Sequence, residues 1–145
     1  SYGGYAALMG LAKDPDQYRC GISWAGVTDI ELLFTTFWDD IPGDAKMYGD
    51  RRLIGDPERD KAKFEATSPL RQVAKIKAPV FLAHGGLDRR VPLEHPERMR
   101  AALKAQGREP EWAFYDTEFH GWYFLDTHRD FWPRVETFLA KHLKP

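Results

Sequence analysis

The sequence contains a single cysteine, Cys20, in 145 residues. One cysteine permits no internal disulfide and no cluster of thiolates around a metal ion, and it leaves the redox compartment undecided. No run of apolar residues is long enough to cross a bilayer. We therefore expect a soluble protein, cytoplasmic or periplasmic, with no membrane partner.

The chain also lacks an excess of either charge, because it has 21 Lys and Arg and 22 Asp and Glu residues, and its formal net charge is −1. A balance of this kind, with Lys and Arg spread through the chain, excludes the footprint of a nucleic-acid-binding protein. His84, His95, His128 and His142 are scattered, and none lies in an H-E-x-x-H pattern. We therefore expect no metal and no cofactor.

Apolar residues make up 43% of the sequence and charged residues 30%, which is the balance of a globular domain. A chain of 145 residues is long enough to bury a substantial core as one domain. Aromatic residues reach 14%, and this content is compatible with an aromatic pocket or simply with a bulky core.

Helical and strand patterns alternate along the chain. The strongest strand signal is the apolar run P-V-F-L-A-H at 79–84, of the type found in sheets covered on both faces. This alternation predicts an α/β fold with about three parallel strands and flanking helices. We expect helices at 3–12, 30–38, 93–106 and 129–143, strands at 20–25, 79–84 and 112–115, and a lid-like set of short helices at 39–70.

The chain opens with S-Y-G-G-Y, which has the form of the second half of the G-x-S-x-G nucleophile elbow. In that turn a serine lies between a strand and a helix. We expect side chains at Gly3 and Gly4 to obstruct the turn and the packing of the helix. The first glycine of the motif and its strand are not in the sequence, so we expect residues 1–145 to be a fragment truncated at the elbow.

Two further candidates follow predicted strands. Asp88 comes after the strand at 79–84, and His120 comes after the strand at 112–115. Taken singly, Asp88 is more typical of a turn and His120 of an ordinary loop histidine. In a parallel sheet, however, both loops lie at the same edge, and Ser1, Asp88 and His120 follow the chain order of the α/β-hydrolase triad. The sequence therefore predicts nucleophilic catalysis by serine.

Three segments together resemble one enzyme family. S-Y-G-G-Y resembles its G-x-S-Y-G-G-Y motif, residues 84–92 (H-G-G-L-D-R-R-V-P) resemble H-G-x-x-D-x-R-V-P, and residues 118–122 (E-F-H-G-W) resemble E-G-H-G-F. Phe119 and Trp122 depart from that last pattern, which affects packing near the histidine. On these motifs the chain resembles the C-terminal part of the catalytic domain of prolyl oligopeptidase family serine peptidases, which have an α/β-hydrolase fold.

The resemblance implies a role for each site residue. Ser1 would be the nucleophile, His120 the general base and then acid, and Asp88 the residue that orients the histidine. The N–H of Tyr2 would be one donor of the oxyanion hole, and an upstream loop would supply the second. Without that loop, we expect the isolated chain to be weakly active or inactive.

The expected substrate is a short peptide. Phe34, Phe37, Trp38 and Tyr48 lie where the family has pocket-lining segments, so we expect them to form an apolar pocket for the substrate. A carboxylesterase on the same fold remains an alternative, because the triad does not distinguish esters from amides. A non-catalytic fragment that self-associates through the exposed edge of its first strand is a second alternative.

Overall fold

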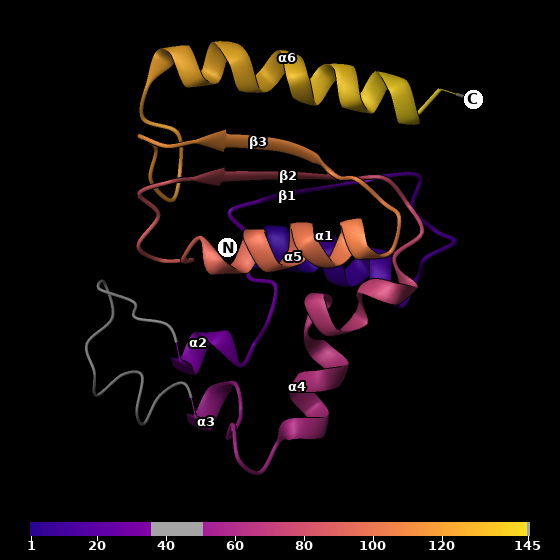
Figure 1. The fold of residues 1–145 in the computed structure, drawn as a ribbon, viewed down its shortest axis with the longest axis vertical. Helices are drawn as coiled ribbons and strands as arrows, with labels where there is room; N and C mark the ends of the chain where they lie inside the picture. Colours follow the sequence, from indigo (N-terminus) through magenta and orange to yellow (C-terminus); the bar gives the residue numbers. More distant parts are fainter. Residues whose placement is uncertain (36–50, 145) are drawn as a thin grey trace.

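The computed structural model describes residues 1–35 and 51–144 of the chain. Within these ranges three parallel strands form one sheet in the order β1-β2-β3, with Gly21 of β1 opposite Val80 of β2 and Phe81 of β2 opposite Glu111 of β3. The elements are α1 (Tyr2–Lys13), β1 (Gly21–Trp24), α2 (Leu32–Thr35), α3 (Arg51–Leu53), α4 (Lys61–Thr67), the 3₁₀ helix η2 (Pro69–Lys75), β2 (Val80–Gly85), α5 (Glu94–Ala105), β3 (Glu111–Tyr115) and α6 (Leu125–His142) (Figure 1).

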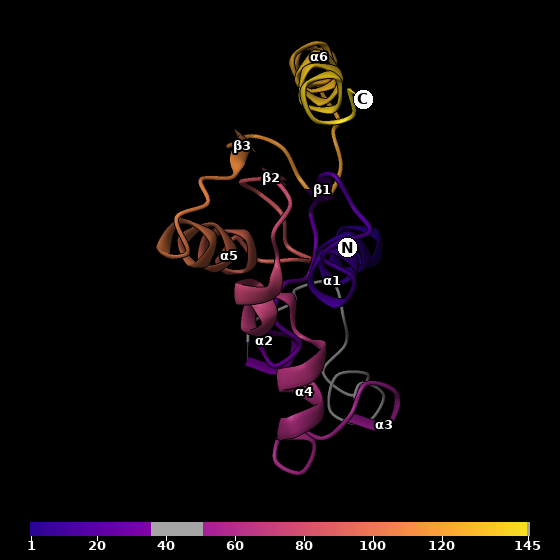
Figure 2. The same ribbon diagram turned by 90° about the vertical axis from the view of Figure 1, so that its right-hand side faces the viewer.

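Helices cover both faces of the sheet: α1 and α5 lie on one face and α6 lies on the other (Figures 1 and 2). Successive side chains of a strand point to opposite faces. Val80 and Leu82 of β2 therefore pack with Leu8 of α1 and Met99 of α5 in one core. The neighbouring positions in β2 enter a second core with Phe131 and Phe138 of α6. This two-sided burial explains why residues 79–84 read as a continuous apolar run.

The predicted alternation of helices and strands is confirmed, but α6 begins earlier than expected. It starts at Leu125, whereas the sequence pattern indicated a start near residue 129. The buried carboxylate of Glu118 accepts hydrogen bonds from the N–H groups of Tyr123 and Phe124, directly before the helix. Because these hydrogen bonds lie before the helix, the periodicity of the helix itself does not reveal them.

A third layer, made of α2, α3 and α4, lies beyond α1 and α5 (Figure 2). The sequence indicated a lid-like region at 39–70, yet Phe64 of α4 is only 1% exposed and its ring stacks on Phe34 of α2 at 5.7 Å between centroids. This part of the region therefore contributes to the interior. Residues 36–50 lie outside the described part of the chain.

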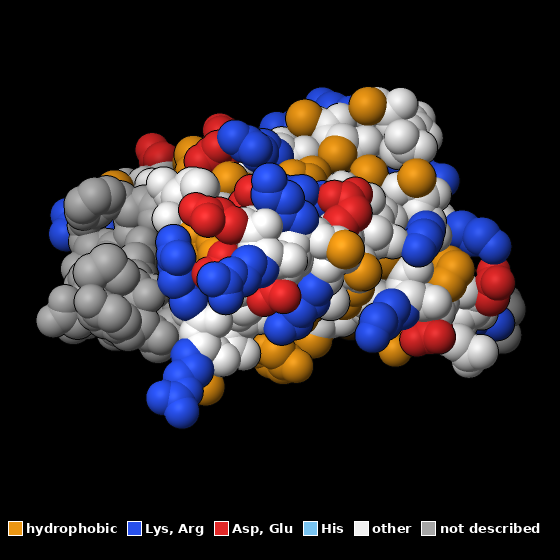
Figure 3. Space-filling model, turned by 90° about the horizontal axis from the view of Figure 1, so that it is seen from below, with side chains coloured by type: hydrophobic (Ala, Val, Ile, Leu, Met, Phe, Trp, Pro, Cys, Tyr) orange, Lys and Arg blue, Asp and Glu red, His pale blue; other side chains and the backbone are white. Residues whose placement is uncertain are grey.

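β1 lies at one edge of the described sheet, as expected, while its pairing with a second copy stays a prediction. On the face seen from below, basic and acidic side chains are intermingled (Figure 3). None of the described helices combines the length and the apolar character needed to cross a membrane.

Candidate active site

The loops after β2 and β3 pack against each other at the carboxyl ends of the strands. The N–H of Gly86 donates to the carbonyl of Tyr115 at 2.8 Å, and the N–H of Leu87 donates to the carbonyl of Glu118 at 2.8 Å. This approach requires a glycine at the end of β2, because a Cβ on Gly85 would lie 2.2 Å from the carbonyl oxygen of Phe119. The two loops therefore form one unit.

Asp88 lies in the first of these loops and is 8% exposed. Its Oδ1 accepts hydrogen bonds from the N–H groups of Arg90 and Val91, both at 2.9 Å. Burial alone would raise the pKa of the Asp88 carboxyl, but hydrogen bonds from His120 and Val91 outweigh it and the pKa is lowered. The carboxylate is therefore charged and fixed in orientation.

His120 lies in the second loop and faces Asp88. Its Nδ1 is 2.8 Å from Oδ2 of Asp88, so Nδ1 carries the hydrogen that this carboxylate accepts. His120 Nε2 is 3.5 Å from the main-chain nitrogen of Ser1. The structure thus brings together the three residues that the sequence singled out, from three separate segments of the chain.

Glu118 supports this second loop, and sequence reasoning gave it no separate role. Its side chain is completely buried, and its two oxygens accept hydrogen bonds from the N–H groups of Tyr123 at 2.8 Å and Phe124 at 3.0 Å. Burial would raise the pKa of Glu118, but these hydrogen bonds outweigh it and lower the pKa. Glu118 therefore joins the loop that carries His120 to the start of α6.

Ser1 precedes α1 at the same edge of the sheet. Its carbonyl accepts hydrogen bonds from the N–H groups of Tyr5 at 3.0 Å and Val27 at 3.4 Å, so the loop after β1 contacts the start of the helix. Tyr2 is the first residue of α1, and the N–H groups of a first helical turn have no acceptor within the helix. The Tyr2 side chain is 77% exposed.

The close contact between α1 and the loop after β1 depends on two glycines. A Cβ on Gly4 would lie 2.6 Å from the Cα of Gly26, and a Cβ on Gly26 would lie 2.7 Å from the carbonyl carbon of Gly4. The expected steric role of Gly4 is therefore confirmed. A Cβ on Gly3 would meet no described atom within 4 Å, and the strand that the expectation places before Ser1 is not in the sequence, so the expectation for Gly3 stays a prediction.

An apolar hollow of about 320 Å³ adjoins Ser1. Sequence reasoning missed its walls, because they come from three separate segments and carry no motif. Of the residues proposed for a substrate pocket, Phe34 lies beside this region in the cluster around Leu33. Phe37, Trp38 and Tyr48 lie outside the described residues. The hollow is lined by Ser1, Tyr2, Tyr5, Val27, Ile30, Leu33 and Ile54.

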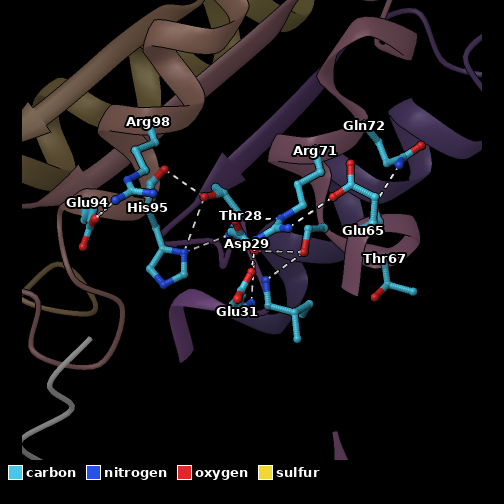
Figure 4. Close-up of polar contacts among 12 residues, drawn as sticks. Thr28, Asp29, Glu31, Glu65, Thr67, Arg71, Gln72, Glu94, His95 and Arg98 are labelled. Carbon is cyan, nitrogen blue, oxygen red and sulfur yellow. Dashed lines mark hydrogen bonds and ion pairs between the residues drawn. The ribbon is translucent and has the colours of Figure 1, made fainter. Parts of the chain in front are cut away.

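Polar contacts hold the segment that forms one wall of this hollow (Figure 4). The main-chain N–H of Thr28 donates to Nδ1 of His95 at 3.2 Å, and the Thr28 hydroxyl donates to the His95 carbonyl at 2.8 Å. Asp29 forms an ion pair with Arg71 at 3.1 Å. The N–H of Ile30 donates to the Ser68 hydroxyl at 2.9 Å. Consecutive residues of this segment are thus anchored to α5, to η2 and to Ser68 directly before η2.

Nothing in the described ranges, 1–35 and 51–144, groups three or more His, Cys, Asp or Glu side chains closely enough to hold a metal ion. The chemistry available at this edge therefore consists of a serine, a histidine with a carboxylate on Nδ1, main-chain N–H groups and an apolar hollow. That combination suits acyl transfer through a serine nucleophile.

The whole chain, residues 1–145, matches the prolyl oligopeptidase family. Dipeptidyl aminopeptidase BIII of Pseudoxanthomonas mexicana is 30% identical over 149 residues, which cover 99% of this chain and 21% of that protein. Inactive dipeptidyl peptidase 10 of Rattus norvegicus is 27% identical over 106 residues, 72% of this chain and 12% of that protein.

Among solved structures, the acylaminoacyl peptidase of Pyrococcus horikoshii superposes with a TM-score of 0.81 and 26% identity over 99% of this chain and 23% of that one. The similarity confirms the predicted α/β-hydrolase fold. The chain spans about a fifth of the length of that structure and of the first of these relatives.

Proposed function

The chain belongs to the prolyl oligopeptidase family, and from this premise we propose that it carries the catalytic residues of a serine peptidase that hydrolyses short peptides. The observation that carries the proposal is the 2.8 Å contact between Asp88 Oδ2 and His120 Nδ1, with His120 Nε2 3.5 Å from the main-chain nitrogen of Ser1. A histidine held in this tautomer has its other nitrogen free to accept a proton.

In the proposed reaction, the Ser1 hydroxyl attacks the carbonyl carbon of the scissile peptide bond while its proton moves to His120 Nε2. Asp88 stabilises the imidazolium that forms. The tetrahedral intermediate then collapses, the C–N bond breaks, and the imidazolium gives its proton to the leaving amine. Water, activated by His120, hydrolyses the acyl-serine ester and restores the enzyme.

The N–H of Tyr2 supports the proposal as an oxyanion donor, because it belongs to the unpaired first turn of α1 directly after the nucleophile. The negative charge of the tetrahedral intermediate develops next to Ser1. A donor aimed at that charge is worth about 10²–10³ in turnover.

The hollow beside Ser1 supports a preference for apolar side chains on the acyl side of the scissile bond. It is lined by Ser1 and Tyr2 but not by His120, and the leaving group departs toward the histidine that protonates it. Its volume of about 320 Å³ is in the range of small ligand pockets. We therefore propose a peptide substrate with an apolar residue before the cleaved bond.

The test is labelling of the chain with a fluorophosphonate probe, which reacts with activated serines. We expect labelling to disappear in Ser1→Ala and His120→Ala and to persist in the control His142→Ala, whose ring lies against Phe138 at the end of α6. Labelling that survives Ser1→Ala would refute the assignment of the nucleophile. An unlabelled chain would support the non-catalytic alternative for this chain.

Turnover of amide and ester substrates decides between a peptidase and an esterase. We expect any hydrolysis of a dipeptide or acyl-peptide amide with an apolar residue before the cleaved bond to be slow, because an upstream loop is expected to supply the second oxyanion donor, and to depend on Ser1 as the probe labelling does. Turnover of a p-nitrophenyl ester with no turnover of any such amide would favour the carboxylesterase instead.

A further inference from the structure

His84 lies in β2, four positions before Asp88, and the proposed mechanism does not use it. The side chain is completely buried, with an exposed fraction of 0%. Its Nε2 is 2.8 Å from the carbonyl oxygen of Val91 and 3.4 Å from Oδ2 of Asp88. Because a carbonyl only accepts hydrogen bonds, Nε2 of His84 carries the hydrogen and donates it to Val91.

The other ring nitrogen of His84 has a different environment. Nδ1 is buried and has no hydrogen-bond partner within the described part of the chain. Burial lowers the pKa of His84, so the ring is neutral near pH 7. A neutral ring has one N–H, and the Val91 carbonyl determines that it is on Nε2.

Val91 connects His84 to the carboxylate of Asp88. Its carbonyl accepts from His84, while its N–H donates to Oδ1 of Asp88 at 2.9 Å. Val91 is itself completely buried. Hydrogen bonds therefore link His84 to Val91 and Val91 to Asp88 across the loop after β2, and Oδ2 of Asp88 faces His120.

We propose that His84 is a positioning residue, which holds Val91 and through it fixes the Asp88 carboxylate in the orientation that His120 requires. Its catalytic consequence rests on the proposed serine hydrolase function, whereas the structural coupling does not. His84 acts on Asp88 mainly through Val91, because its 2.8 Å hydrogen bond to the Val91 carbonyl is shorter than its 3.4 Å distance to Asp88 Oδ2.

Two amide substitutions separate this role from ordinary core packing. In His84→Gln the side-chain amide reaches about the position of Nε2, so its N–H can donate to Val91. In His84→Asn the amide reaches only the position of Nδ1, where no described group accepts or donates. Both variants replace the ring by a smaller amide, and they differ in which nitrogen position they reproduce.

The first readout is the proton resonance of His120 Nδ1–H in its hydrogen bond to Asp88, recorded by NMR at low temperature. We expect His84→Gln to retain this downfield resonance and His84→Asn to lose it, and Asp88→Asn, which removes the carboxylate that accepts this hydrogen, is the reference for its loss. Retention in both amides, or loss in both while the fold persists by circular dichroism, would overturn the proposal. Should His84→Asn not fold, loss of the resonance in folded His84→Gln still overturns it.

The second readout is the rate of fluorophosphonate labelling. We expect His84→Asn to slow labelling by at least about tenfold and by less than the roughly 10⁴-fold loss that follows removal of the orienting aspartate charge in serine proteases. His84→Gln should recover most of the rate. If the unmodified chain is not labelled at all, the proposed function fails for this chain, while the resonance still decides whether His84 positions Asp88.

Discussion

At the scale of single residues, the buried polar groups of the site are held by the main chain. Asp88 and Glu118 each accept two main-chain N–H groups, and His84 donates to a main-chain carbonyl. A carboxylate bound in this way keeps its charge although it is buried. The orientation of the site therefore follows from the course of two loops.

Asp88→Asn tests this arrangement. The Asn oxygen can still accept the N–H groups of Arg90 and Val91, but an amide NH₂ then faces His120 Nδ1 and favours the wrong tautomer of the imidazole. We expect the labelling rate to fall by about 10⁴-fold with the fold intact. Labelling is measured as a rate constant beside circular dichroism, and a loss below about tenfold would contradict the role of Asp88.

Glu118→Gln tests the second loop. One oxygen that accepts a main-chain N–H becomes an NH₂ group facing that donor, so a buried N–H is left unpaired. We expect the free energy of unfolding in urea to fall by about 1–3 kcal/mol. The control is Glu109→Gln, which removes an exposed ion pair with Lys104 and should cost about 0–1 kcal/mol. Equal losses in the two variants would contradict a special role for Glu118.

The residues that we propose for catalysis were predictable as neighbours, and the residues that support them were not. Ser1, Asp88 and His120 could be found because each follows a recognisable pattern and their order matches a known triad. Glu118 gives no sign of its burial in the sequence, and His84, although it ends the predicted buried strand, gives no sign of the group that it contacts. Their roles depend on hydrogen bonds to main-chain groups whose positions only the folded loops define.

At the scale of elements, α1 and the loop after β1 touch through their main chains. Strands and the longer helices could be predicted because burial on two faces and helical periodicity leave direct traces in the sequence. The start of α6 could not, since the segment before it is held by Glu118 in the preceding loop. The different packing of Gly3 and Gly4 could not either, because both are glycines in the same apolar helix.

Neighbouring glycines in α1 provide a matched pair of variants. Gly4→Ala would bring a Cβ to 2.6 Å from the Cα of Gly26, a main-chain atom that cannot move aside cheaply. We expect it to destabilise the protein by about 1–3 kcal/mol. Gly3→Ala meets open space and should stabilise the helix by up to about 1 kcal/mol. The free energy of unfolding in urea is measured for both variants. A loss of stability in Gly3→Ala would show that packing does not distinguish Gly3 from Gly4.

At the scale of the whole molecule, two completely buried histidines connect the site to the interior. His84 holds the loop of Asp88, and His95 accepts from the main chain of Thr28 in the wall of the hollow. Burial lowers the pKa of both rings, and the pKa of His95 falls to about 4. Both rings are therefore neutral in the folded protein at neutral pH.

The sign of the resulting pH dependence follows from which state binds more protons. Unfolded His95 takes up a proton as the pH falls through about 6.5, whereas the folded ring stays neutral until the pH reaches about 4. Between these values the unfolded state binds more protons, so stability decreases as the pH decreases. The lowered pKa values of Asp88 and Glu118 act below this window, because unfolded carboxylates protonate only near pH 4.

We therefore expect the free energy of unfolding in urea to fall by an amount on the order of 3 kcal/mol between pH 6.5 and pH 4 on account of His95 alone. Asp29 and Asp88 oppose this shift, whereas His84 and Arg98 reinforce it. In His95→Asn the amide oxygen can accept from Thr28 without titrating, so the loss in the free energy of unfolding between pH 6.5 and pH 4 should become smaller by about that amount. An undiminished slope in His95→Asn would mean that the acid sensitivity of the fold arises elsewhere.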